Sequence, residues 1–402
     1  MATGSVLISG ASVAGPTLAY WLRRHGFRPT VVERAPVLRK GLGGHAVDLF
    51  GAAVDVAEWM GVLPAVLAAR TKTEVMTFVR PGKPPVDVDL RRLVATISDR
   101  HVEIMRGELA SILYDATRDD VEYVFGDSIA ALTDTDAGVR VTFEHGPPRT
   151  FDLVVGADGL HSVVRRLVFG DEAGYRRYIG GYLAVYTVPN HLRLSGRMLT
   201  YLAPGRLSGM YPVWQTGAAR ATFLFRRAEE FRYDHRDVAR QKQLLRETFA
   251  GDGWEVPRLL HELDDSEDFY FDSISQIVMD TWSRGRVTLV GDAGYSPGPA
   301  VGGGTAGAVI GAYLLAGELN DAGGDHRIAF PAYERAMGEF VRRSRAMGPT
   351  MMKTLIPRTP RQVWLTPQAV RLLPKLPPRL QRGVLSMQGG PARALAAVNL
   401  KR

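Results

Sequence analysis

The sequence of 402 residues contains no cysteine, so disulfide bonds and thiolate metal sites are excluded. This composition suits a reducing compartment, and we expect a cytoplasmic protein. The nine histidines form neither an H-x-H nor an H-E-x-x-H pattern, so we expect no metal centre. The N-terminus shows no basic segment followed by an apolar stretch and a cleavage site, which argues against export. The longest apolar stretch, residues 306–315, is shorter than the ~20 residues that span a bilayer. It predicts a buried helix, and we expect no integral membrane segment.

Acidic residues are missing from the C-terminal region. Residues 341–402 contain 13 Lys and Arg but no Asp or Glu, whereas the rest of the chain has 37 basic and 42 acidic side chains. The overall charge of +8 is therefore a local feature and does not indicate a nucleic-acid partner. We interpret the basic region as a solvated face on helices that pack over the body. Contact with anionic lipid or another polyanion is the alternative.

Residues 6–33 show the pattern of a strand, a tight turn, a helix and a second strand, which is the βαβ unit of a dinucleotide-binding fold. Leu18, Trp21 and Leu22 share one helical face, and Gly26 stands where a helix C-terminal glycine is expected. We predict that the second strand ends at Glu33.

A glycine-rich turn joins the first strand to the helix. Gly10 to Gly15 follow the pattern G-x-S-x-x-G, in which Ser12 replaces the usual middle glycine. Such a turn brings backbone N–H groups and a helix N-terminus close to a pyrophosphate, and Glu33 is placed to accept hydrogen bonds from ribose hydroxyls. The segment misses the G-x-S-x-G pattern of a hydrolase nucleophile, because Ala14 stands at the second glycine. The predicted nucleotide contacts of this element are Gly10, Ser12, Val13, Ala14, Gly15, Glu33 and Arg34.

Two later segments also read as a buried strand that ends in glycine beside aspartate. Residues 152–159 end with Asp158 and Gly159, and residues 286–293 contain Gly291 and Asp292. Ligands bind at the carboxyl ends of strands in open α/β sheets, where an aspartate accepts hydrogen bonds from cofactor hydroxyls. Three such strand ends predict one nucleotide cofactor lying across them. A loop follows the third, and its predicted cofactor contacts are Pro299, Gly302, Gly304 and Thr305.

Between about residues 180 and 272 the sequence changes to alternating, aromatic-rich runs, which indicate antiparallel strands. Dinucleotide-binding elements lie on both sides of this region. We therefore predict an α/β protein with a discontinuous Rossmann-like cofactor domain, an antiparallel-sheet substrate domain and C-terminal helices. The predicted ranges are 1–80, 97–172 and 273–340 for the cofactor domain, 81–96 and 173–272 for the substrate domain, and 341–402 for the basic C-terminal helical region.

Together, the three motifs resemble the class A FAD-dependent aromatic hydroxylases, the para-hydroxybenzoate hydroxylase family, over the chain up to about residue 340. The resemblance implies that the cofactor is FAD. It also implies that Gly10, Gly15 and Glu33 hold the ADP half of FAD and that Asp292 holds the ribitol chain. Arg106, in the segment Ile-Met-Arg-Gly-Glu-Leu, matches a cofactor-contacting arginine of the family.

The resemblance gives the other two segments further roles. Asp158 and Gly159 match a motif implicated in both FAD and NAD(P)H binding. The stretch from Pro299 to Thr305 would aim a helix N-terminus at the pyrimidine edge of the flavin, where its dipole stabilises the anionic reduced ring.

Residues 43–48 and the Gly-Asp-Ala-Gly-Tyr-Ser-Pro segment resemble the tetracycline-inactivating monooxygenase branch and its relatives in secondary metabolism. This implies a flavin-side contact for Asp48. We interpret His45 as a hydrogen-bonded loop histidine, with a place in the flavin pocket as the alternative. The tyrosine at position 186 departs from the branch, so drug specificity is not carried over. The predicted substrate contacts are Tyr186, Arg206, Met210 and Phe223, in strands whose alternate residues face opposite sides.

The implied function is an FAD-dependent monooxygenase that uses NADPH or NADH as a transient reductant. It would hydroxylate a bulky aromatic or polyketide-like small molecule with O2 through a flavin C4a-hydroperoxide, without an obligate protein partner. A flavin dehydrogenase or reductase and a non-catalytic ligand-sequestering protein are the alternatives. The chain lacks a redox cysteine pair and the W-x-W-x-I-P signature, which disfavours disulfide reductases and flavin halogenases.

Overall fold

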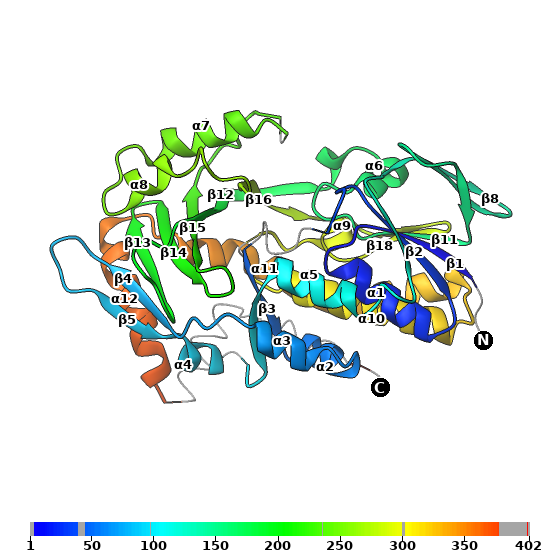
Figure 1. The fold of residues 1–402 in the computed structure, drawn as a ribbon, viewed down its shortest axis with the longest axis horizontal. Helices are drawn as coiled ribbons and strands as arrows, with labels where there is room; N and C mark the ends of the chain where they lie inside the picture. Colours follow the sequence, from blue (N-terminus) through cyan, green and yellow to red (C-terminus); the bar gives the residue numbers. More distant parts are fainter. Residues whose placement is uncertain are drawn as a thin grey trace.

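A computed structural model describes residues 4–38, 45–96, 98–234, 236–299, 302–377 and 400. The predicted βαβ unit forms β1 (Ser5–Ser9), α1 (Ala14–Arg24) and β2 (Arg28–Glu33) at the centre of a six-stranded sheet (Figure 1). The predicted inner face of α1 is buried, and the helix ends just before Gly26, whose φ is +89°. The sequence therefore predicted this unit correctly.

Strands from distant parts of the sequence complete the six-stranded sheet. Five strands run parallel, and β17 at the edge is antiparallel to its neighbour. This arrangement confirms that the domain is discontinuous in sequence. The order is β17 (Ser283–Arg284), β18 (Val287–Leu289), β11 (Leu153–Gly156), β1, β2 and β7 (Glu122–Phe125).

Helices cover this sheet, and a small antiparallel sheet flanks it. The predicted buried helix is part of α10, which packs between α1 and α11. Besides α1, the helices on this side of the molecule are α5 (Arg106–Asp115), α6 (Val163–Phe169), α9 (Asp292–Tyr295), α10 (Gly304–Asp321) and α11 (His326–Leu355), with the short 3-10 helix η1 (Glu172–Gly174). The small sheet contains β8 (Ile129–Thr135), β9 (Gly138–Phe143) and β10 (Arg149–Phe151).

The second large sheet has seven strands and is antiparallel except for the parallel pair β13 and β4. Its order is β16 (Tyr270–Ile277), β12 (Arg176–Val188), β15 (Ala218–Arg226), β14 (Arg206–Val213), β13 (Arg197–Ala203), β4 (Val75–Val79) and β5 (Val86–Asp89). Figure 1 shows α7 (Val238–Phe249) and α8 (Val256–His261) over one face of this sheet. The sheet begins at Val75, six residues before the predicted substrate domain, because β4 pairs with β13. The division into functional domains stays a prediction.

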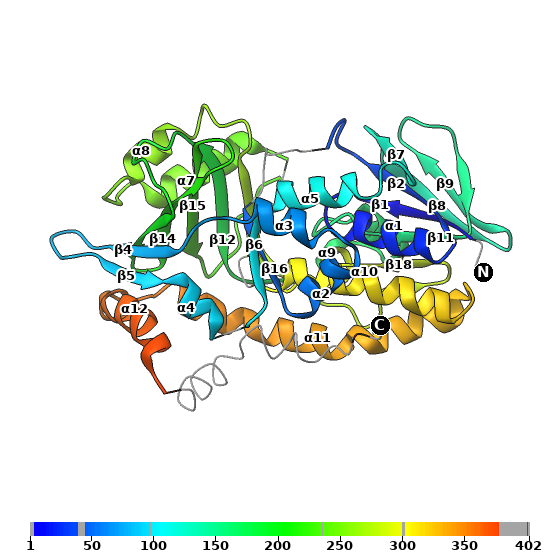
Figure 2. The same cartoon turned by 60° about the horizontal axis from the view of Figure 1, so that its bottom comes forward.

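The antiparallel pair β3 (Ala46–Phe50) and β6 (His101–Met105) lies between the two large sheets in both views (Figures 1 and 2). Three short helices accompany it: α2 (Ala52–Trp59), α3 (Leu63–Ala69) and α4 (Leu90–Ala95). Within the described parts of the chain, no single helix is long and apolar enough to cross a membrane. Helices α2 and α3 meet that test only as a pair bent by 118°.

Helix α11 continues through the predicted boundary at residues 340 and 341 and runs beneath both large sheets (Figure 2). α12 (Pro360–Leu372) follows, with a capping box between Thr359 and Gln362, and ends in the 3-10 turn η2 (Leu373–Lys375). The predicted C-terminal helices are therefore present up to Lys375. Residues 378–399 and 401–402 of the predicted basic region lie outside the described residues.

Candidate functional site

The three glycine-rich strand ends lie side by side at one edge of the six-stranded sheet. Ser9 at the end of β1 pairs with Gly156 of β11, which pairs with Leu289 of β18. Because all three strands are parallel, the turn at Gly10 and the loops that carry Asp158 and Asp292 leave the sheet at the same edge. The structure thus brings the three predicted segments together.

The first turn has no room for side chains at its two glycines. Gly10 has a φ of +109°, and a methyl group there would lie 2.5 Å from the carbonyl oxygen of Ala157. A methyl group at Gly15 would lie 1.9 Å from the carbonyl oxygen of Gly10. Val13 is the N-cap residue of α1, and no described side chain caps this helix. Its first N–H groups, starting at Ala14, are therefore available to an anion.

Glu33 lies against this turn at the end of β2. One carboxylate oxygen accepts a hydrogen bond from the backbone N–H of Ala11 at 2.8 Å, and the other accepts one from Ala35 at 2.9 Å. Each oxygen keeps a second lone pair, so the carboxylate retains the capacity to bind ribose hydroxyls. Arg34 is exposed beside it.

Ser12 is tied to the arginine that the family resemblance singled out. The Nε of Arg106 donates a hydrogen bond to Ser12 Oγ at 3.2 Å, and the backbone N–H of Arg106 donates to the carbonyl of His45 at 3.3 Å. Arg106 is the first residue of α5. Arg106 therefore links the glycine-rich turn, through its side chain, to the residue before β3, through its backbone N–H.

The segment before β3 is described only from His45, so the predicted glycines Gly43 and Gly44 lie outside the described residues. Burial, followed by the positive charge of Arg106, lowers the pKa of His45 to about 4, so its ring is neutral at physiological pH. Asp48 lies 2.6 Å from Nε2 of His101 on β6. Its predicted contact with a flavin stays a prediction.

The carboxylate of Asp158 is occupied by its own loop. It accepts hydrogen bonds from Ser162 Oγ at 2.5 Å and from the backbone N–H groups of Val163 and Val164 at 2.8 and 3.1 Å. These bonds fix the start of α6, while burial raises the pKa of Asp158. Gly159 follows with a φ of +80°. The structure gives Asp158 a loop-forming position, and its predicted role with FAD and NAD(P)H stays a prediction.

The third segment places a buried carboxyl group beside a second open helix N-terminus. Gly291 has a φ of +68°. Burial raises the pKa of Asp292, and the charge of Arg106 opposes that rise. A methyl group at Gly304 would lie 3.6 Å from the Asp292 carboxylate. α10 starts at Gly304, and its N-cap Gly303 supplies no side chain. Of the predicted loop contacts, Pro299 and Gly302 border residues 300–301, which lie outside the described residues, and Thr305 lies in the first turn of α10.

A cavity of about 190 Å³ lies between the seven-stranded sheet and the β3–β6 pair. One part of its wall is polar and one part is aliphatic. The polar residues are His45, Thr73, Glu103, Tyr211 and Thr222, and the apolar residues are Ala46, Leu183, Val185, Met198 and Leu224. Because His45 lines the cavity and its carbonyl binds Arg106, the cavity adjoins the candidate cofactor site.

Burial raises the pKa of the two titratable acids in the polar wall, Glu103 and Tyr211. Burial and the nearby charge of Asp48 raise the pKa of Glu103, which also accepts a hydrogen bond from the hydroxyl of Thr71. Burial raises the pKa of Tyr211 to about 12, and its hydroxyl accepts a hydrogen bond from the N–H of Ala46 at 3.3 Å. The buried hydroxyl of Thr222 faces that of Tyr211 without a well-formed hydrogen bond. A ligand in the cavity therefore meets unused hydrogen-bonding groups.

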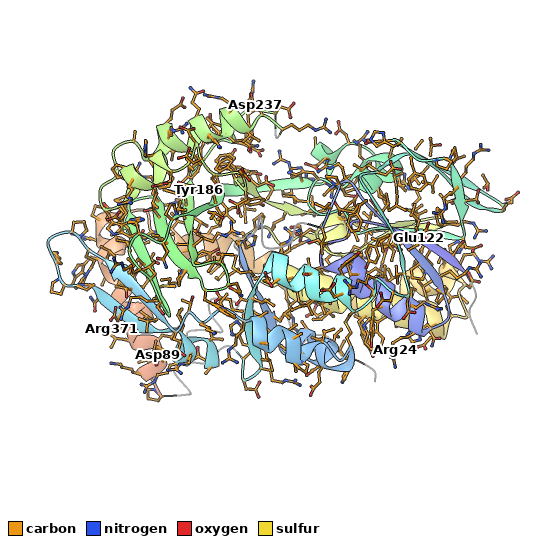
Figure 3. All side chains as sticks on the ribbon, viewed as in Figure 1. Arg24, Asp89, Glu122, Tyr186, Asp237 and Arg371 are labelled. Atoms are coloured by element: carbon orange, nitrogen blue, oxygen red, sulfur yellow. The ribbon has the colours of Figure 1, made fainter. Side chains whose placement is uncertain are left out.

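The four predicted substrate contacts lie on the face of the sheet opposite to the cavity, and their role with a substrate stays a prediction. Tyr186, Met210 and Phe223 are buried among the side chains of α7 and α8. The Tyr186 hydroxyl donates to the carbonyl of Leu259 at 2.7 Å, and Figure 3 shows Tyr186 between the strands and these helices. Arg206 pairs with Asp252 at 2.7 Å on the same side.

The sequence did not predict that Glu103 and the aliphatic residues line a cavity. Those residues alternate with the predicted ones: Leu183 and Val185 precede Tyr186 on β12, and Thr222 and Leu224 flank Phe223 on β15. Strand alternation was the only available signal, and it does not say which face is covered. In the part of the chain that the structure describes, no group of three His, Asp or Glu side chains is arranged to hold a metal ion.

Comparisons with known proteins agree with this geometry. A family model described as FAD binding domain matches residues 3–327. An uncharacterised protein of Mycobacterium tuberculosis is 45% identical over 342 residues, covering 85% of this chain and 91% of the relative. A flavin-dependent monooxygenase from an unknown prokaryotic organism is 41% identical over 346 residues, covering 86% and 89%. The crystal structure of the tetracycline destructase Tet(55) superposes with a TM-score of 0.83 at 36% identity, covering 99% of this chain and 98% of that one.

Proposed function

The chain belongs to the FAD-binding domain family and is an FAD-dependent monooxygenase, and we propose that it oxygenates one ring of an aromatic or polyketide-like molecule with NADPH or NADH as reductant. The observation that carries the proposal is the contact between cavity and cofactor site. His45 lines the cavity, Arg106 binds the His45 carbonyl, and Ser12 binds Arg106. A substrate in the cavity would therefore lie beside the cofactor.

The residues at the sheet edge fit FAD. Gly10 and Gly15 form a turn in which a Cβ would collide with the backbone, and two helices direct open N-termini at the same edge. Glu33 would bind the adenosine ribose, and Asp292 would bind the ribitol hydroxyls. FAD, when bound, supplies the transfer of electrons from a nicotinamide to O2. The N-terminus of α10 would stabilise negative charge on the reduced ring.

The cavity defines the part of the substrate that reacts. Its volume of about 190 Å³ is close to the roughly 150 Å³ of an apolar cavity that binds benzene, so it holds one ring or a little more. Leu183, Val185 and Leu224 would contact the ring face, while Glu103 and Tyr211 would bind a hydroxyl or carbonyl on its edge. The raised pKa of Glu103 favours an uncharged carboxyl for orienting that group, and the aliphatic wall reduces contact with water.

The test begins with the FAD-loaded protein. We expect a yellow protein whose NADPH or NADH oxidation is stimulated by a member of a panel of polycyclic phenols and tetracyclines, with one atom of labelled O2 in the product. Tetracyclines belong in the panel because Tet(55) is a tetracycline destructase. Protein that stays colourless after FAD addition would contradict the proposal. Turnover of the same substrates without oxygen would instead indicate a dehydrogenase.

A further inference from the structure

A second concave surface, the arginine groove, has a volume of about 760 Å³ and is lined by Arg226, Arg227 and Arg358. Gly180 of β12, Gly205 from the β13–β14 turn and Pro349 of α11 complete its wall. Two segments that are distant in sequence, at residues 226–227 and 358, thus bring guanidinium groups to one surface. The volume falls within the range of about 300–1,000 Å³ that is usual for small-molecule sites.

No carboxylate neutralises these arginines among the described residues. None of the three takes part in an ion pair, and Glu230, which lies close to them in sequence, is bound by both terminal nitrogens of Arg176. The C-terminal region also supplies no acidic side chain, because residues 341–402 contain no Asp or Glu. Among the residues that the structure describes, the positive charge of the arginine groove is therefore uncompensated.

Without a bound ligand, Arg226 has the least favourable surroundings of the three arginines. Its Nε is buried and has no hydrogen-bond partner within the described ranges. Burial, and then the like charge of Arg358, lower the pKa of Arg226. Arg227 lies over the ring of Phe231 with 4.1 Å from its guanidinium carbon to the ring centre, which holds that side chain beside the groove. An anion bound between these groups would relieve both the like-charge repulsion and the unpaired donor.

The arginine groove and the cavity share one face of the seven-stranded sheet. Leu183 pairs with Leu224 in the cavity wall, and the next pair on that face is Gly181 with Arg226. Two residues along a strand span roughly 7 Å, so Arg226 lies about one side chain beyond the cavity. Met352 of α11 packs over Gly181 on this face, so an anionic substituent on a ring in the cavity would have to pass Met352 to reach Arg226.

We propose that the arginine groove binds an oxyanion, a phosphate or carboxylate group carried by a small-molecule ligand of this enzyme. Guanidinium groups recognise both with paired hydrogen bonds. The anion belongs either to the substrate, whose ring lies in the cavity, or to the pyridine nucleotide. The binding step does not depend on the proposed oxygenation, so it can be tested without turnover.

The first experiment measures the binding of inorganic pyrophosphate to the FAD-loaded protein by isothermal titration calorimetry at low salt. We expect one site, with affinity reduced about tenfold or more by Arg358→Gln and by Arg226→Gln, because each removes a charge-assisted interaction. Arg371→Gln is the matched control, since Arg371 is an exposed arginine at the other end of α12 (Figure 3) and should leave binding unchanged. Arg358 is also exposed, so its variant tests the proposal even if Arg226→Gln fails to fold. Absence of binding, or equal weakening by all three variants, would overturn the proposal.

A second experiment identifies the source of the anion. If the groove binds the 2′-phosphate of NADPH, Arg358→Gln lowers kcat/KM for NADPH about tenfold and leaves NADH unchanged. If the groove binds the substrate, the same variant raises KM for carboxylated substrates with either nucleotide and leaves their neutral analogues unchanged. Both results support an oxyanion site. An Arg358→Gln enzyme with wild-type kinetic constants for every nucleotide and substrate would contradict the oxyanion site. A protein that binds pyrophosphate but cannot oxidise any substrate would refute only the proposed function.

Discussion

At the scale of single residues, Ser12 shows how a departure from a motif can be functional. Its hydroxyl accepts the Nε–H of Arg106 at 3.2 Å. We predict that Ser12→Gly, which restores three glycines, weakens FAD binding about threefold to tenfold, because a hydrogen bond of about 0.5–1.5 kcal/mol that holds Arg106 is lost. Quenching of flavin fluorescence during titration of the FAD-free protein measures the change.

The double variant Ser12→Gly with Arg106→Gln is the control. If the serine acts through the arginine, Ser12→Gly has no further effect once Arg106 is changed. Tighter FAD binding by Ser12→Gly alone would show that the serine is only a tolerated substitution.

His161 gives a pH dependence to the loop that carries Asp158. Burial disfavours its charge, but Asp272 and Glu172, at 3.1 and 2.9 Å from its ring nitrogens, outweigh that effect and raise its pKa to about 9. Its contribution to stability is therefore fully present below the unfolded value of 6.5 and is lost as the pH rises through about 9. Its side chain is 34% exposed, so we expect only about 1 kcal/mol after solvent screening.

The test compares denaturant unfolding of the wild type and His161→Asn between pH 6 and 9.5. Arg165 and Arg176 also contact Glu172, and they stay charged throughout this range, so the difference isolates the histidine. We expect the stability difference between the two proteins to shrink as the pH rises. A difference that is constant with pH would contradict the charged state of His161.

At the scale of the element, the two faces of the seven-stranded sheet differ in what covers them. Tyr186 faces α7 and α8, whereas Tyr211 lines the cavity. We predict that Tyr186→Phe lowers the free energy of unfolding by about 1 kcal/mol through loss of its bond to the Leu259 carbonyl, with KM unchanged. Tyr211→Phe should raise KM at least about threefold, with a smaller loss of stability because the bond that its hydroxyl accepts from Ala46 is longer, at 3.3 Å.

The two variants control each other, because each removes one hydroxyl from a tyrosine in the same sheet. Thermal unfolding and steady-state kinetics, measured on both, give the comparison. A raised KM in Tyr186→Phe together with an unchanged KM in Tyr211→Phe would return the substrate to the face that the sequence analysis predicted.

The elements themselves were predictable from sequence because their signals are local. A few residues encode the turn that requires glycine at positions 10 and 15. A few residues likewise encode the helix with one apolar face. The buried face of a strand is not local, because α7, which covers Tyr186, begins only at Val238. For the same reason the sequence did not reveal that β4 pairs with β13, in which Val75 lies beside Arg197. In the sequence, Glu103 looks like any acidic residue in a strand of alternating polar and apolar side chains. Only the structure shows its burial.

At the scale of the whole molecule, the two large sheets are joined by continuous elements. α11 packs Ala329, Tyr333 and Phe340 against the cofactor side and Met352 against β12 of the other sheet. The side chain of Arg165, fully buried, binds the carbonyl of Ala293 and so connects the second and third strand-end loops. These links favour unfolding as one unit.

We therefore predict a single cooperative transition in which loss of bound flavin, far-UV circular dichroism and calorimetry coincide, although the chain has two sheets. Phe340→Ala tests the link: Phe340 lies against Gly307 of α10, and its removal should cost about 3–5 kcal/mol and lower all three midpoints together. Adding FAD should raise the common midpoint in both proteins, because the ligand binds only the folded state. If Phe340→Ala lost flavin at a lower temperature than its circular dichroism signal, the six-stranded sheet would unfold independently of the seven-stranded sheet. The cavity beside the β3–β6 pair would then open before the seven-stranded sheet unfolds.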